Sequence, residues 1–343
     1  MINEIKVEIS GLSKVYGPAP EAVLPLVKQG VSKKMLLEKH GHILALNNIN
    51  LSIPSHSILV VMGLSGSGKS TLVRHINRLV EPTAGKIFVD NINVLEMSKK
   101  EILYFRRHNA SMVFQNFALL PHRTVLQNVM YGRIIQGNYD DNIEKTSLEW
   151  IERVGLIGYE KHFPPQLSGG MQQRVGLARA LSTGADLLLM DEAFSALDPL
   201  IRADMQNILL DLQAEFKKTI IFITHDLNEA LRIGDRVAIL NDGTMIQEGK
   251  PDDIIMQPAN DYIANFTAEL ERGRFIKVSS IMESSVITCS LKLSKSMTVN
   301  EALGKFVIHE VDVANVTDDA DRVVGHVKLK KLIAAIHPIK ELR

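Results

Sequence analysis

A glycine-rich segment that ends in lysine and serine has residue types and spacing suited to chemistry. Residues 63–70 read Gly-Leu-Ser-Gly-Ser-Gly-Lys-Ser and fit the pattern G-x-x-x-x-G-K-[ST]. Glycines let backbone N–H groups approach a phosphate where a Cβ atom would obstruct them, and a helix that follows adds its positive dipole end. We therefore expect the phosphates of a nucleotide to be bound by Gly63, Ser65, Gly66, Ser67, Gly68, Lys69, Ser70 and Thr71.

The context of this segment favours phosphate binding over an ordinary Gly/Ser turn. An apolar run at 58–62 precedes it and a helical pattern at 71–78 follows it, which is the arrangement that the pattern needs. Lys69 is expected to reach the β- and γ-phosphates. The Ser70 hydroxyl is expected to ligate Mg²⁺.

Acidic residues and a histidine follow two further apolar runs. Asp191 and Glu192 come directly after 187–190, and His225 follows 219–224. Ligands bind at the carboxyl ends of strands in open α/β sheets, so we expect Asp191 to hold Mg²⁺ and Glu192 to activate the attacking water. His225 is expected to contact the γ-phosphate. The alternatives are a solvent-exposed acidic strand end and a histidine with a structural hydrogen bond.

A second glycine pair opens another helix at Leu167-Ser-Gly-Gly170. Ser168, Gly169 and Gly170 form a phosphate-binding helix start of the same physical kind as the first. One γ-phosphate does not need two such starts from one chain. Two chains packed head to tail would use both, each completing the nucleotide site of the other.

The composition limits the possible classes of function. The chain has 343 residues, which suggests two domains, and Lys+Arg equals Asp+Glu at 39 each, so no basic excess for nucleic acid is visible. Cys289 is the only cysteine, which fits a reducing compartment. The N-terminus has the pattern of a strand, not of a signal peptide, and the apolar runs are too short to span a bilayer.

The order of the patterns predicts an α/β core with a mostly parallel sheet and a separate C-terminal unit. We expect an edge strand in 1–16, an inserted loop with a short helix in 18–42, and a hairpin turn at Asp242-Gly243. The tail should contain a helix at 298–306, a strand at 322–327 and a helix at 329–336.

These motifs together resemble the ATP-binding-cassette (ABC) ATPases over residues 1–270. Leu167-Ser-Gly-Gly170 looks like the signature motif, with Gln172 beside it and Met171 where many members have glutamine. The resemblance implies that Gln115 is the Q-loop glutamine and a Mg²⁺ ligand, that Asp198 belongs to the D-loop, and that Tyr16 stacks on adenine. It further implies an ATP-bound homodimer that works on integral-membrane permease subunits.

Several longer stretches are similar to the quaternary amine importers of this family, which take up glycine betaine, proline betaine or choline. They include the insertion 30–40, the segment 112–122 and Met190–Arg202. The resemblance implies an extracytoplasmic solute-binding protein as partner and a peripheral position on the cytoplasmic face of the inner membrane. Residues 271–343 resemble a CBS module, single or truncated, through Thr298–Leu303 and Val324–Leu329.

The predicted fold is therefore a P-loop ABC-ATPase cassette at 1–270 and a small α+β CBS-like domain at 271–343. The cassette should have a mixed sheet core, an antiparallel β subdomain and a helical subdomain inserted at about 120–185. An importer of another solute, such as an amino acid, remains an alternative. A cassette ATPase acting on ribosomes or DNA is disfavoured because the chain has one cassette, no heptad run and no basic excess.

Overall fold

The computed structural model describes residues 4–137, 142–268, 270–285, 287 and 289–336, and the chain divides into two compact units, 1–246 and 247–343. We expected the boundary near residue 270. The boundary lies earlier than expected because residues 250–268 form hydrogen bonds with the C-terminal segment that follows them. Arg272 donates a 2.9 Å hydrogen bond to the carbonyl of Ile255, and the Ser280 hydroxyl bonds to Asp252.

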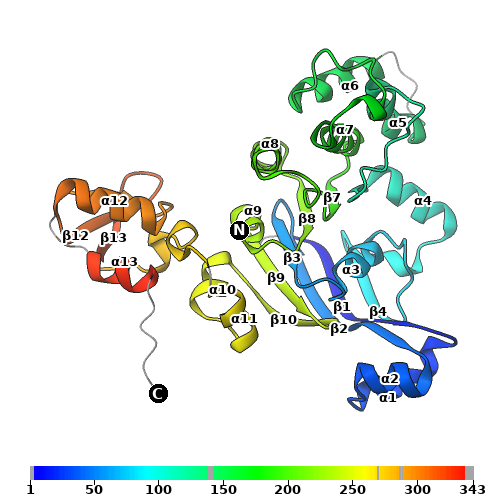
Figure 1. Cartoon of the computed structure of the whole chain (residues 1–343), viewed down its shortest axis with the longest axis horizontal. Coiled ribbons are helices and arrows are strands. Elements are labelled where there is room, and N and C mark those ends of the chain that lie inside the picture. The colour runs from blue at the N-terminus through cyan, green and yellow to red at the C-terminus, as the bar shows by residue number, and fades with distance from the viewer. Residues whose placement is uncertain (1–3, 138–141, 269, 286, 288, 337–343) are drawn as a thin grey trace. The chain divides into compact units, whose positions relative to one another are not determined.

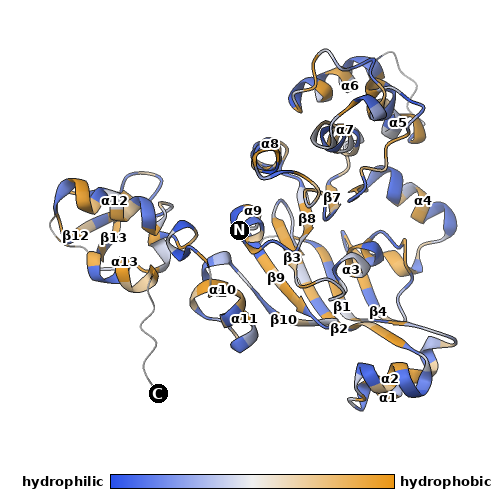
Figure 2. Cartoon of the chain, in the orientation of Figure 1, coloured by the Kyte–Doolittle hydropathy of each residue, from blue (hydrophilic) through white to orange (hydrophobic). Residues whose placement is uncertain are grey.

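A six-stranded sheet forms the core of the first unit (Figure 1). Neighbouring strands from β9 to β6 run parallel, and residues of β3, β7 and β8 are buried along their whole length, as expected for strands covered on both faces. Figure 2 shows how hydrophobic these strands are. The order across the sheet is β10 (Thr244–Gly249), β9 (Arg236–Asn241), β3 (Ile58–Met62), β8 (Thr219–Thr224), β7 (Leu187–Asp191) and β6 (Ala110–Val113).

A second, antiparallel sheet lies beside the core and shares its hydrophobic cluster. Its order is β2 (Ile43–Pro54), β1 (Ile5–Tyr16), β4 (Ala84–Val89) and β5 (Ile92–Asn93). The prediction of an edge strand at the N-terminus was wrong, because β1 pairs with β2 on one side and with β4 on the other. The alternating pattern of β1 could not reveal the second partner, which lies some 70 residues further along the chain.

The segment between β1 and β2 folds into a small helical insertion. It holds η1 (Pro20–Val23), α1 (Leu24–Lys28) and α2 (Lys33–His40). A separate apolar cluster anchors it, and Leu36 of α2 is fully buried there. The imidazole of His42 bonds to the carbonyls of Pro18 (2.7 Å) and His40 (2.5 Å), so it joins the two ends of the insertion.

Helices cover the core sheet, and three of them pack together with a cluster of their own. Val129, Ile151 and Val175 belong to this cluster and come from α5, α6 and α7 respectively. The helices of the first unit outside the insertion are α3 (Lys69–Ile76), η2 (Val94–Glu96), α4 (Lys99–His108), α5 (Val125–Ile135), α6 (Asn142–Arg153), η3 (Pro164–Gln166), α7 (Gly169–Ser182), α8 (Pro199–Phe216) and α9 (Leu227–Ile233).

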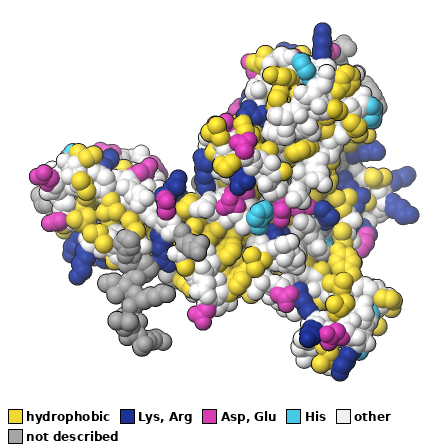
Figure 3. Space-filling view, viewed as in Figure 1, with side chains coloured by type: hydrophobic (Ala, Val, Ile, Leu, Met, Phe, Trp, Pro, Cys, Tyr) yellow, Lys and Arg dark blue, Asp and Glu magenta, His cyan; other side chains and the backbone are white. Residues whose placement is uncertain are grey.

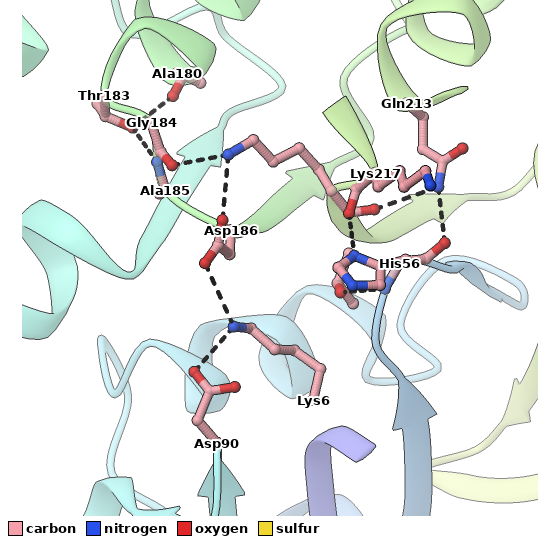
Figure 4. Close-up of polar contacts among 12 residues, drawn as sticks. Lys6, His56, Asp90, Ala180, Thr183, Gly184, Ala185, Asp186, Gln213 and Lys217 are labelled. Carbon is pink, nitrogen blue, oxygen red and sulfur yellow. Dashed lines mark hydrogen bonds and ion pairs between the residues drawn. The ribbon is translucent and has the colours of Figure 1, made fainter. Parts of the chain in front are cut away.

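Polar contacts fix the amino ends of the core strands (Figure 4). Just before β7, the Asp186 carboxylate forms ion pairs with the ammonium groups of Lys218 at 3.3 Å and Lys6 at 3.9 Å. Before β3, His56 bonds through its ring to the carbonyl of Lys217, while Gln213 donates to the His56 carbonyl at 2.9 Å. These contacts hold neighbouring strands in register at the sheet edge opposite their carboxyl ends.

The second unit contains a three-stranded sheet in the order β11-β12-β13. β12 pairs parallel with β11 and antiparallel with β13, and Phe306, Val316 and Leu332 are buried between sheet and helices. Its elements are α10 (Pro251–Met256), α11 (Asp261–Phe266), η4 (Arg272–Arg274), η5 (Val278–Ser280), β11 (Lys292–Ser294), α12 (Val299–His309), β12 (Val313–Thr317), β13 (Val323–Lys328) and α13 (Leu329–Ile336).

The surface carries charges of both signs. On the face drawn in Figure 3, Lys and Arg side chains are interspersed with Asp and Glu. In the part of the chain that the structure describes, no helix combines the length and the apolar character needed to cross a membrane.

Candidate functional site

The order of the parallel strands brings four predicted segments to one edge of the core sheet. β3 leads into the glycine-rich segment, β7 ends at Asp191, β8 leads to His225 and β6 leads to Gln115. Because these strands are neighbours in the order β3-β8-β7-β6, residues far apart in sequence meet at their carboxyl ends.

The glycine-rich segment wraps around Lys69, whose side chain is only 4% exposed. Its ammonium donates to the carbonyls of Gly63 (2.9 Å) and Leu64 (3.1 Å). Gly63 (φ 150°) cannot carry a side chain, because a Cβ atom there would lie 2.1 Å from the carbonyl oxygen of Leu240. Gly68 (φ 99°) is constrained in the same way by the carbonyl of Ala45. The tight loop therefore depends on glycine at both positions.

Lys69 is a buried cation that faces a carboxylate. Its ammonium lies 3.6 Å from the Glu192 carboxylate. Burial lowers the pKa of Lys69 below its ordinary value, and the charges of Glu192 and Asp191 partly oppose this shift. The Ser67 hydroxyl beside it is buried without a hydrogen-bond partner among the described residues. A polyanion in the loop would add negative charge and hydrogen-bond acceptors beside the buried ammonium of Lys69.

Ser70 and Asp191 supply oxygen atoms suited to Mg²⁺. The Ser70 hydroxyl donates to Asp191 at 2.6 Å, and Arg74 pairs with the other carboxylate oxygen at 3.0 Å. A hydroxyl and a carboxylate next to a phosphate loop are the ligand types that Mg²⁺ takes, together with waters and phosphate oxygens. The residues present therefore fit this ion.

Glu192 lies at the centre of the remaining predicted residues. Its carboxylate is 3.4 Å from the amide nitrogen of Gln115 and 3.6 Å from Nδ1 of His225. The backbone of Glu192 is left-handed (φ 48°), which is uncommon for a residue other than glycine and redirects the chain directly after the buried strand. A carboxylate between an ammonium, an amide and an imidazole can orient a water and accept its proton.

A cavity of about 740 Å³ extends from the glycine-rich loop. Tyr16, Ser65, Gly66, Gly68, Lys69, Ser70, Thr71, Gln115 and Glu192 all line it, as the sequence predicted for residues that share a ligand. Asp191 is buried beneath Ser70, and Gly63 meets the cavity through its contact with Lys69.

The predicted signature residues are not part of this cavity. Ser168 is exposed and caps α7 by accepting a 3.3 Å hydrogen bond from the Met171 backbone, while Gln172 donates to the carbonyl of Leu167 at 3.1 Å. Gly169 is exposed and Gly170 is partly so. Asp198 is exposed and caps α8 through the backbone of Ile201 at 3.1 Å.

Sequence reasoning missed three contributors to the site. Arg74 pairs with Asp191, as Ser70 does. The available signal was its position four residues after Ser70, because residues at this spacing lie on the same face of a helix. Arg179 of α7 donates to the carbonyls of Phe117 (3.0 Å) and Ala118 (2.7 Å), which follow Gln115 and have left-handed backbones. The insertion also lines the cavity, through Lys33, Lys34 and Leu37.

This fold and site define a cassette-type nucleoside triphosphatase. The family described as "ABC transporter" matches residues 46–195. The glycine betaine/carnitine transport ATP-binding protein GbuA of Listeria monocytogenes is 52% identical over 81% of this chain and 70% of its own length. ProV of Salmonella typhimurium, a glycine betaine/proline betaine transport ATP-binding protein, is 42% identical over 97% of this chain and 83% of its own length. The chain belongs to the ABC transporter family and is an ATP-binding, ATP-hydrolysing subunit.

Solved structures confirm the predicted cassette fold. The ATP-binding cassette MJ0796, solved as a dimer in a post-hydrolysis state with ADP and Pi, is 34% identical and gives a TM-score of 0.61 over 71% of this chain and 98% of its own.

A further sequence relative matches the chain over nearly its whole length. This relative is the trimethylamine N-oxide transport ATP-binding protein TmoW of Pelagibacter ubique. It is 42% identical over 96% of this chain and 97% of its own length.

Proposed function

We propose that this chain hydrolyses ATP in the described cavity through Lys69, Ser70, Asp191 and Glu192. The observation that carries the proposal is their convergence: two neighbouring residues of the loop meet two neighbouring carboxylates, Lys69 with Glu192 at 3.6 Å and Ser70 with Asp191 at 2.6 Å. Ser70, Asp191 and Gln115 would hold Mg²⁺, which would neutralise phosphate charge when bound with ATP. Lys69 binds the β- and γ-phosphate oxygens.

Glu192 orients the attacking water and accepts its proton. His225 lies on the neighbouring strand end and contacts the γ-phosphate and the same water. Its side chain is 56% exposed, so it is free to reorient when a phosphate arrives. Tyr16 is 41% exposed at the cavity wall and stacks on adenine.

We further propose that two copies of the chain share each nucleotide. At the start of α7, Ser168 and Gly169 are exposed and Gly170 and Gln172 are partly exposed; Asp198 is exposed as well, so a second copy can reach all of them. The dimeric MJ0796 cassette supports this arrangement. Closure on ATP and reopening after hydrolysis drive integral-membrane permease subunits, with the chain held at the cytoplasmic face of the membrane as a peripheral protein.

The transported solutes are proposed to be glycine betaine-type quaternary amines. Support comes from the relatives: four glycine betaine transport ATP-binding proteins are 42–52% identical to this chain. An extracytoplasmic solute-binding protein would select the solute, because the solute does not enter this cavity. We assign residues 271–343 a CBS-like regulatory role, since the β-α-β-β-α order from β11 to α13 suits one such module.

Trimethylamine N-oxide is a second candidate solute. It shares the trimethylated nitrogen of glycine betaine, and TmoW matches this chain over nearly its whole length. Import of an amino acid is a third possibility. The methionine import protein MetN of Staphylococcus haemolyticus is also 42% identical, but over 67% of this chain.

An uptake experiment separates these solutes. The chromosomal copy would be deleted in the source organism and replaced by the wild-type chain or by Glu192→Gln, and uptake of labelled glycine betaine, trimethylamine N-oxide and methionine would be followed. We expect glycine betaine uptake to fall in the deletion and in Glu192→Gln, and to return with the wild type. Unchanged glycine betaine uptake, with loss of either other solute, would contradict the assignment.

A further inference from the structure

Helix α2 of the insertion forms part of the nucleotide cavity. Lys33, Lys34 and Leu37, all on one side of this eight-residue helix, line the cavity together with Tyr16 and Ile43. The insertion was expected as a loop with a short helix, and no role for it follows from the motifs of the cassette. Its place in the cavity wall is therefore a separate observation.

The cavity has a phosphate end and a second end, whose wall combines the apolar Tyr16, Leu37 and Ile43 with the charged Lys33, Lys34 and Asp242. The carbonyl of Ala45 lies against Gly68 of the phosphate loop, and Ile43 lies two residues away along β2, a distance of about 7 Å in a strand. Tyr16 is the cross-strand partner of Ile43, so the two side chains are neighbours on one face.

The side chains at this end are unusually exposed for their type. Leu37 is 52% exposed and Ile43 is 56% exposed, although both line a cavity. Large apolar side chains around a concave surface favour a flat apolar ligand, and the purine of a nucleotide is such a group. The cavity therefore offers apolar contacts to a purine beyond the ring of Tyr16.

Several contacts hold α2 rigidly in this position. The Lys33 ammonium lies 2.8 Å from the Asp242 carboxylate, which joins the start of α2 to the turn between β9 and β10. Ser32 caps the helix by accepting from the Met35 backbone at 3.3 Å, and Leu36 is buried in the cluster of the insertion. Leu37 is thus presented from a fixed helix.

We propose that α2 is a second wall of the base-binding end, with Leu37 packing on the purine of the bound nucleotide. Lys33 is a positioning residue that holds α2 through Asp242. Lys34, exposed at the cavity mouth, adds a cation near the nucleoside. The inference rests on the proposed binding of ATP in this cavity. It assigns the insertion a role in nucleotide affinity that the phosphate loop does not supply.

Calorimetric binding of ATP and of inorganic tripolyphosphate to the full chain tests this role, with Glu192→Gln present in every variant to prevent hydrolysis. Leu37→Ala should weaken ATP binding about fivefold and leave tripolyphosphate binding unchanged, because only ATP carries a base. Lys33→Ala should give a smaller loss in the same direction. Met35→Ala is the matched control, since Met35 is an apolar residue of α2, 42% exposed, that does not line the cavity.

The outcomes separate this inference from the proposed function. Equal ATP affinity in Leu37→Ala and Met35→Ala would overturn the role of α2, and so would an equal loss for ATP and tripolyphosphate in Leu37→Ala. Lys69→Ala should weaken both ligands. If Lys69→Ala binds both ligands as tightly as its parent, the proposed ATP site itself is wrong.

Discussion

Two helix starts in this chain present backbone N–H groups in opposite ways. The start of α3 lies inside a cavity, where Lys69 is buried against Gly63 and Leu64 and faces Glu192. The start of α7 lies in the open, and the Ser168 hydroxyl bonds only within its own helix turn in the described contacts. The start of α3 therefore forms part of a cavity that can bind phosphates. The start of α7 offers the same kind of backbone N–H groups but does not line this cavity.

In the proposed mechanism, the catalytic groups line the cavity, whereas the start of α7, which does not line it, closes on the nucleotide of a second copy. Because Glu192 and Lys69 meet within one copy, we expect a single copy to bind ATP. Ser168 is expected to act on a nucleotide from a second copy. Binding and turnover should therefore respond differently to changes at the two helix starts.

Glu192→Gln should have the largest effect and should affect turnover alone. Replacing the carboxylate by an amide removes proton acceptance but keeps the size of the side chain, so ATP hydrolysis should fall roughly 100- to 10,000-fold. ATP affinity should stay within about twofold or improve, because a negative charge near the phosphates is lost. Phosphate release and equilibrium binding measure the two quantities, and a variant that hydrolyses at the wild-type rate would exclude Glu192 as the base.

Lys69→Ala should strongly weaken the binding of ATP to the single chain. Without the ammonium, the phosphates lose their buried cation, and ATP affinity should fall about 100-fold. Fluorescent nucleotide titration gives this number. Lys39→Ala serves as a control, since Lys39 is an exposed lysine of α2 that does not line the cavity and should leave affinity unchanged.

Ser168→Arg should separate the two helix starts most clearly. An arginine at the exposed start of α7 would obstruct a partner, so hydrolysis should fall about tenfold or more while ATP binding to the single chain is unchanged. Ser98→Arg is the matched control, because Ser98 is also an exposed serine that caps a helix, α4, away from the cavity. Equal loss of hydrolysis in both variants would reduce Ser168 to a structural cap.

The lowered pKa of Lys69 predicts proton uptake on ATP binding. In the free chain, Lys69 loses its proton at lower pH than an ordinary lysine, whereas bound phosphates favour the charged form. Affinity should therefore decrease severalfold as pH rises from about 7 toward about 10, with uptake of up to one proton at the alkaline end. Calorimetry in two buffers of different ionisation enthalpy detects the uptake, and its absence at alkaline pH would contradict the assigned environment.

Glu229→Gln should have the smallest effect, on stability alone. Glu229 is buried on α9 and receives a 3.1 Å hydrogen bond from Gln206, and burial raises its pKa. Its charged form therefore lowers stability at neutral pH, and this penalty disappears as pH falls through the raised pKa toward the value of the unfolded chain. Glutamine should stabilise the fold by about 1 kcal/mol at neutral pH and less at acidic pH, as thermal unfolding at several pH values would show.

The phosphate loop and the core strands were predictable because their signals are local. The phosphate loop is formed by consecutive residues, 63–70, so its sequence pattern is enough to predict it. The apolar runs of β3, β7 and β8 predict strands buried on both faces. The carboxyl ends of parallel strands then place Asp191, Glu192 and His225 together by topology alone.

The errors and omissions concern contacts between distant segments. The pairing of β1 with β4 and the bonding of α10 to the tail leave no trace in local periodicity. The same holds for Leu37, which belongs to an insertion whose helical pattern was predicted but whose place in the cavity wall was not. Such positions depend on the whole fold.

Sedimentation of the Glu192→Gln chain with and without ATP tests the shared nucleotide most directly. The account predicts a monomer without ATP, a dimer with ATP, and a monomer that still binds ATP when Ser168→Arg is added. A Glu192→Gln chain that binds ATP and stays monomeric at every concentration, or a dimer that Ser168→Arg leaves intact, would contradict it.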